Sequence, residues 1–153
     1  MSDITIDNLI FDRTNANLNN RYDDKGKYDY RDYNRVGSAT ATVALELRHK
    51  GYVNLPIYPK TNWINTDIPR QSQMTTYKGN IQTIVDTLEL ENQLPTTNKN
   101  IATILGANQL EKALYDAYDI LQKMMVWDDV DELYETWETL DNKHLKWGKY
   151  FLK

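Results

Sequence analysis

Few side chains in this 153-residue chain are suited to nucleophilic or acid–base catalysis, since it has no cysteine and two histidines, His49 and His144. Histidine is the usual base at neutral pH. His49 lies between Arg48 and Lys50 at an expected helix end, where cations suit the helix dipole, and His144 lies in a lysine-rich stretch. The chain has no G-x-S-x-G motif. A convergent carboxylate pair of the glycosidase kind is the one catalytic alternative left open, and we expect no enzyme.

The acidic residues near the C-terminus do not have the pattern of a metal site. The run from Asp128 to Glu138 lacks the glycine turn and the ligand spacing of a calcium-binding EF-hand loop. The 6 glycines are scattered and form no phosphate-binding loop. We therefore expect no metal and no cofactor, and an acidic strip that faces solvent or a partner. It can pair, within the tail or between copies, with the basic residues that follow, Lys143, Lys146, Lys149 and Lys153.

Aromatic residues are the strongest signal of a binding function, with Tyr 11 and Trp 4 against Phe 2. Tyr and Trp combine an apolar ring with a polar tip, and both are enriched in protein interfaces. We predict that the partner-binding residues are Tyr28, Tyr30, Tyr33, Trp63, Trp127, Trp137 and Trp147. Two alternatives stay open for the tyrosines between Tyr22 and Tyr33: they cover the edge of a small core, or they bind a saccharide together with the Trp faces.

Apolar residues spaced alternately by three and four predict the helices that must position these side chains. The spacing predicts helices over residues 29–50, 70–91 and 107–126, with stripes such as Val36, Val43 and Leu47. Gly51 is a natural stop for the first helix and Pro95 for the second. Residues 52–69 hold three of the four prolines and form a connection. The expected fold is mainly α, a small bundle of about three amphipathic helices with long polar loops. Short intermolecular coiled coils are the alternative.

The chain divides into an N-terminal arm (1–28), a helical domain (29–126) and a tryptophan-repeat tail (127–153). The arm has a short apolar start and is either a frayed terminus or a segment that orders against a neighbour. In the tail, Trp127, Trp137 and Trp147 are spaced by ten residues. Such a period favours stacked short turns. A single helix is the competing interpretation.

Charge and hydropathy exclude several classes of protein. The net charge is -4, the pI is near 5.2 and the mean hydropathy is -0.70, so we expect no nucleic-acid partner. No apolar run reaches the roughly 20 residues of a membrane span, and the first residues do not have the pattern of a secretory signal. We therefore expect no membrane partner.

An ordered set of short motifs over about residues 10–125 resembles tail-associated minor structural proteins of phages and prophages of Gram-positive bacteria. The motifs resemble a DRT start, a D-x-N-R-V helix, a K-T-x-W connection and an A-N-x-L-E helix. In this chain they are Asp12-Arg13-Thr14, Asp32 with Asn34-Arg35-Val36, Lys60-Thr61 with Trp63, Asp67-Ile68-Pro69, Met74, Tyr77, Asn80-Ile81, Ala107-Asn108 and Leu110-Glu111. The tail also resembles the W-D-x-[LV]-x repeats at the ends of some phage structural proteins.

This resemblance implies a virion component near the tail tip or baseplate, made in the cytoplasm of the bacterial host and without enzymatic activity. Its partners would be other virion proteins, with several copies or a homo-oligomer in the assembly. The alternative function is a saccharide-binding module that recognises a cell-surface receptor.

Overall fold

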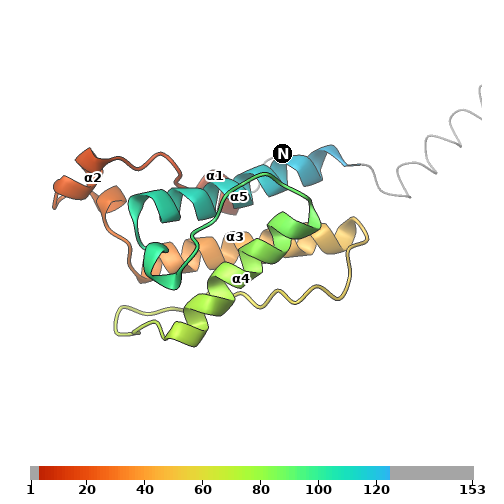
Figure 1. Ribbon diagram of the computed structural model, residues 1–153, viewed down its shortest axis with the longest axis horizontal. Coiled ribbons are helices and arrows are strands. Elements are labelled where there is room, and N and C mark those ends of the chain that lie inside the picture. The colour runs from red at the N-terminus through yellow and green to blue at the C-terminus, as the bar shows by residue number, and fades with distance from the viewer. Residues whose placement is uncertain (1–3, 125–153) are drawn as a thin grey trace, which may run out of the picture.

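A computed structural model describes residues 4–124 of the chain (Figure 1). This part is mainly helical, as the sequence predicts, and it contains no strand. Three long helices, α3, α4 and α5, make up most of it, and short helical turns precede and separate them. In chain order the elements are α1 (Ile4–Asp7), α2 (Asn15–Asn19), η1 (Asp24–Gly26), α3 (Tyr30–His49), α4 (Gln71–Thr87), η2 (Asn98–Asn100) and α5 (Ile104–Lys123).

The long helices lie near the predicted positions, and local capping explains where they begin and end. Asp29 caps α3, because its side chain accepts a hydrogen bond from the Arg31 amide, and the Arg31 side chain lowers the pKa of the Asp29 carboxyl. Gly51, at φ 97°, follows the end of α3. α5 begins three residues before the predicted Ala107, because the Thr103 hydroxyl accepts from the Gly106 amide.

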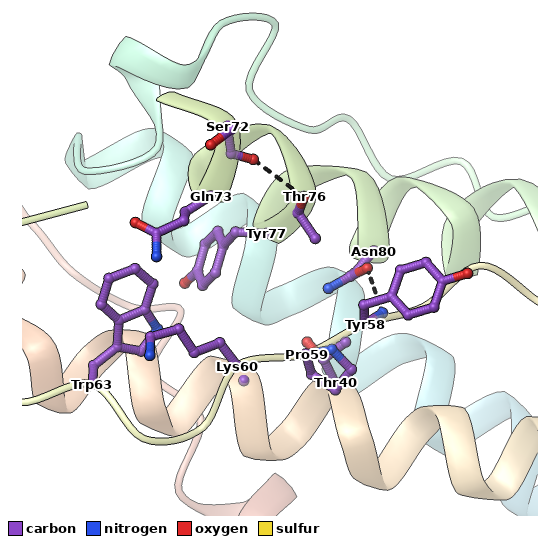
Figure 2. Close-up of a pocket in the computed structure, with 11 residues that line it drawn as sticks. Thr40, Tyr58, Pro59, Lys60, Trp63, Ser72, Gln73, Thr76, Tyr77 and Asn80 are labelled. Atoms are coloured by element: carbon purple, nitrogen blue, oxygen red, sulfur yellow. Dashed lines mark hydrogen bonds between the residues drawn. The ribbon is translucent and has the colours of Figure 1, made fainter. Parts of the chain in front are cut away.

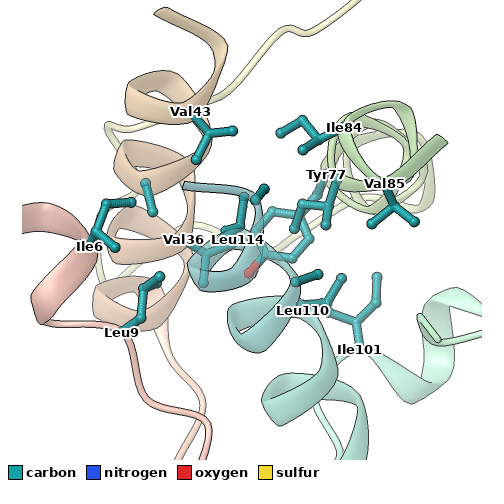
Figure 3. Packing of buried hydrophobic residues seen from close by; sticks show 14 of the residues in the cluster. Ile6, Leu9, Val36, Val43, Tyr77, Ile84, Val85, Ile101, Leu110 and Leu114 are labelled. Atoms are coloured by element: carbon teal, nitrogen blue, oxygen red, sulfur yellow. The ribbon is translucent and has the colours of Figure 1, made fainter. Parts of the chain in front are cut away.

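The helices pack around one apolar core (Figure 3). α3 and α5 run side by side, and α4 crosses them obliquely (Figure 1). Their buried stripes include Val43 of α3, Ile84 of α4 and Leu114 of α5. Ile6 and Leu9, from the N-terminal arm, are buried in the same core. The start of the arm is therefore ordered against α3 and α5, and it contributes to the core that they form.

The connection between α3 and α4 follows an extended path across the two helices. It approaches α3 so closely that a Cβ on Gly37 would lie 2.2 Å from the Lys60 carbonyl oxygen. Only glycine allows this contact between helix and connection. Among the helices described, none is long and apolar enough to cross a membrane.

Candidate functional site

A cluster of four charged side chains, three of them buried, joins the N-terminal arm to α3 and α5. Glu111, whose side chain is 0% exposed, lies 2.6 Å from Arg13 Nη1 and accepts a hydrogen bond of 2.6 Å from Arg35 Nε. Asp32 Oδ1 accepts from Arg35 Nη2 at 2.7 Å and lies 3.5 Å from Arg13 Nη2. The contact between Arg13 and Glu111 lacks good hydrogen-bond geometry and acts by opposite charge. The two arginines and two carboxylates balance in formal charge.

The charges in this cluster neutralise one another, and their ion pairs link the N-terminal arm, α3 and α5. Burial alone would lower the pKa of Arg35, but the hydrogen bond and charge of Glu111, together with Asp32, raise it above its ordinary value. Both carboxylates are therefore committed to arginines. The Asn108 side chain adds two hydrogen bonds to the backbone of Arg13, at 3.2 Å to its amide and 3.0 Å to its carbonyl. This fixes the arm on α5.

Two further asparagines hold the connection between α3 and α4. The Asn34 side chain accepts from the Trp63 amide at 2.7 Å and donates to the Trp63 carbonyl at 2.8 Å. Asn80 Oδ1 accepts from the Tyr58 amide at 2.9 Å. A buried backbone N–H or C=O group needs a hydrogen-bond partner. In a sheet a neighbouring strand would provide it, and here the side-chain amides of Asn34 and Asn80 provide it. The connection is thus fixed at two points without forming regular structure.

Eight residues of the short motifs described above make these contacts. They are Arg13, Asp32, Asn34, Arg35, Trp63, Asn80, Asn108 and Glu111. The sequence analysis did not assign the four charged residues to a site. One signal was available for Glu111, which lies on the apolar stripe of α5 between Ala107 and Leu114, where a charge needs a buried partner.

Three of the predicted partner-binding residues lie together in an aromatic cluster. The Tyr33 ring is 5.1 Å from Tyr28, 5.3 Å from Trp63 and 5.5 Å from Tyr77, measured between centroids. The hydroxyl groups of Tyr28 and Tyr77 share a hydrogen bond, and burial raises the pKa of both phenols above the ordinary value. Trp63 is only 4% exposed. These rings cover an edge of the core.

The other predicted residues are not in this cluster. Tyr30 is exposed in the first turn of α3, and Trp127, Trp137 and Trp147 lie outside the described residues. The most exposed large apolar side chains of the α3–α4 connection are Ile68 at 85% and Tyr58 at 70%, and Ile64 and Val53 are also exposed. Sequence patterns gave no reason to single out these four, because periodicity carries no information in an irregular segment.

A pocket of about 210 Å³ lies between α3, α4 and the connection (Figure 2). We call it the α3–α4 pocket. Aromatic and amide side chains dominate its wall. The lining residues are Gly37, Thr40, Tyr58, Pro59, Lys60, Trp63, Ser72, Gln73, Thr76, Tyr77 and Asn80. The indole N–H of Trp63 is buried without a hydrogen-bond partner in the described structure.

Within residues 4–124, no group of three or more histidine, aspartate or glutamate side chains is arranged to hold a metal ion. Two features of the described residues can contact another molecule, namely the exposed apolar side chains on the connection and the α3–α4 pocket. Comparison of the chain with protein-family models, with curated proteins and with solved structures gives no match.

Proposed function

We propose that this protein is a non-enzymatic structural component of a phage tail or baseplate that acts through protein–protein contacts. The observation that carries the proposal is the group of exposed apolar side chains on the α3–α4 connection. Tyr58, Ile64 and Ile68 lie on one short segment, and Ile68 is 85% exposed. Single exposed apolar residues are ordinary, but a group on one segment is typical of an interaction surface.

The way in which the connection is held supports this function. Asn34 and Asn80 fix its backbone at Trp63 and Tyr58. A segment that is already ordered loses little conformational freedom when a partner binds, so more of the contact energy contributes to affinity. Aromatic and aliphatic side chains on a rigid backbone are suited to act as interface anchors.

The motifs that suggest phage tail proteins also support a structural function. Their charged and amide residues build the scaffold that fixes the arm and the connection, rather than a reactive site. Arg13 of the arm and Glu111 of α5 pair at 2.6 Å, so they hold these two segments together.

The first experiment asks whether the protein is part of a virion and whether it assembles. We expect mass spectrometry to find it in phage particles purified from the bacterium that encodes it. We also expect the molar mass of the purified full chain, measured by light scattering, to increase with concentration. Replacing Ile64 and Ile68 together with serine should weaken this association, while Leu45→Ser, at an exposed site on α3, should not. A chain that is absent from particles and monomeric at every concentration would contradict the proposal.

The α3–α4 pocket favours a second candidate, a saccharide-binding module. Its wall combines the rings of Tyr58, Trp63 and Tyr77 with amide and hydroxyl groups, the mixture that a sugar ring requires. Binding to a glycan array that Tyr58→Ala abolishes and Tyr30→Ala leaves intact would favour this function. No binding to any glycan would exclude it.

A further inference from the structure

The α3–α4 pocket is large enough for one ring. Its volume is about 210 Å³, and a protein cavity of about 150 Å³ can hold benzene. Tyr77 and Trp63 provide flat apolar surface in the wall. A single six-membered ring with a small substituent therefore matches the space, whereas a long chain or a fused polycycle would not fit.

Two amide side chains in the wall present N–H donors to a ligand. Asn80 Oδ1 accepts from the Tyr58 amide at 2.9 Å, and Gln73 Oε1 accepts from the Arg70 amide at 2.8 Å. Because a backbone amide can only donate, these bonds fix which end of each side chain is oxygen. The nitrogen ends of Asn80 and Gln73 point into the space between the helix and the connection (Figure 2).

Charge in the wall has one sign. Of the residues that line the pocket, Lys60 is the only charged one. Its Nζ lies 4.9 Å from the centroid of the Trp63 ring and donates to Asn62 Oδ1 at 2.8 Å. An ammonium group has three donors, so Lys60 can bind a further acceptor.

We propose that the α3–α4 pocket binds a small ligand made of a single ring that carries a carboxylate. The carboxylate pairs with Lys60 and accepts a hydrogen bond from an amide N–H of the wall, and the ring lies against the aromatic side chains. Either an aromatic acid or an acidic sugar has this chemistry. The inference does not depend on a role in a phage tail, because it rests only on the contents of the pocket.

The test is a titration of the full-length protein, labelled with ¹⁵N, followed by NMR. Phenylacetate and glucuronate are the two acidic probes, and phenethylamine, a ring with a positive charge, is the matched control. We expect saturable shifts of the side-chain amide signals of Asn80 and Gln73 with at least one acid. A response to phenylacetate alone identifies an aromatic acid, and a response to glucuronate alone identifies an acidic sugar.

Two variants locate the binding. Lys60→Met removes the charge and should weaken binding by about tenfold or more, as expected for a charge-assisted hydrogen bond. Thr76→Leu, at an exposed position of α4, should fill the pocket and abolish the shifts without disturbing the core. Lys99→Met, on η2 and outside the pocket, should bind as the unmodified protein does.

Three results would each overturn the proposal. The first is that neither acid gives a saturable shift. The second is that phenethylamine binds as tightly as the acids. The third is that folded Lys60→Met and Thr76→Leu proteins both bind within twofold of the unmodified chain.

Discussion

Replacing Glu111 with glutamine is the sharpest test of the buried charge cluster. The substitution keeps the volume of the side chain and removes one negative charge. Glu111 is completely buried, and it contacts both Arg13 and Arg35 at 2.6 Å. After the change, two arginine side chains, 3% and 17% exposed, would share the single carboxylate of Asp32. The cluster would then hold one uncompensated positive charge.

The expected cost follows from this burial. Removing one partner of a buried ion pair typically costs about 3–5 kcal/mol, because the remaining charge is left without compensation. At about 2–4 °C per kcal/mol for a chain of this size, the melting temperature should fall by roughly 6–20 °C. Since a domain is stabilised by only about 5–15 kcal/mol in total, this loss is a large share of the whole.

Urea unfolding followed by far-UV circular dichroism would measure this free energy. Asp119→Asn is a matched control, because it is also an acid-to-amide change on α5. Among the described residues, Asp119 pairs with Lys123, at 2.8 Å and on the exposed surface. Its loss should change the free energy of unfolding by no more than about 0.5 kcal/mol.

A double-mutant cycle would separate the charge effect from other effects of the substitution. In an Arg13→Met background, Glu111→Gln should cost less than in the unmodified protein, because Arg35 and Asp32 then balance and no positive charge is left uncompensated. The reasoning is wrong if Glu111→Gln costs no more than Asp119→Asn. It is also wrong if the two substitutions at the cluster are simply additive.

Two further predictions concern the connection and the tyrosines. Gly37→Ala should destabilise the protein and change the Trp fluorescence, because the new Cβ would lie 2.2 Å from the Lys60 carbonyl oxygen. Gly79 has open space around it, so Gly79→Ala should stabilise α4 by about 0.5–1 kcal/mol. Equal effects of the two substitutions in urea unfolding would refute this prediction. Tyr28 and Tyr77 have raised pKa values in the folded protein, so they should stay protonated while exposed tyrosines ionise. Because the unfolded chain loses these two protons more easily, the free energy of unfolding should fall as the pH rises above about 10. Ultraviolet absorbance that shows all tyrosines titrating together would contradict this prediction.

The long helices could be predicted from the sequence, because a helix depends on neighbours three and four residues apart. The stripe through Val36, Val43 and Leu47 marks the buried face of α3, and Gly51 follows its end. The start of α5 was missed because Gly106 weakens a helix on propensity alone. In the structure, a Cβ at Gly106 would lie 1.9 Å from the Asn100 carbonyl oxygen, so glycine is required there by packing.

The candidate site was predicted only in part. The sequence directed attention to Tyr28, Tyr33 and Trp63 as residues for a partner, but it gave no sign that Tyr77 would bring them together. An aromatic ring in a loop and one in a helical stripe look unrelated until the chain folds. The amide donors that Asn80 and Gln73 present to the α3–α4 pocket were likewise hidden, because their orientation depends on which end of each amide binds the backbone.

By itself, the sequence determined the mainly helical character of the described chain, the positions of its three long helices and the irregular connection between the first two. These features arise from residues close together in the chain. Only the tertiary structure decided that Arg13 and Glu111 form a buried pair and that Asn34 holds the backbone of Trp63. The physical reason is that a charge or an amide is buried only when several segments, distant in the sequence, pack around it and exclude water. No local sequence pattern records that packing.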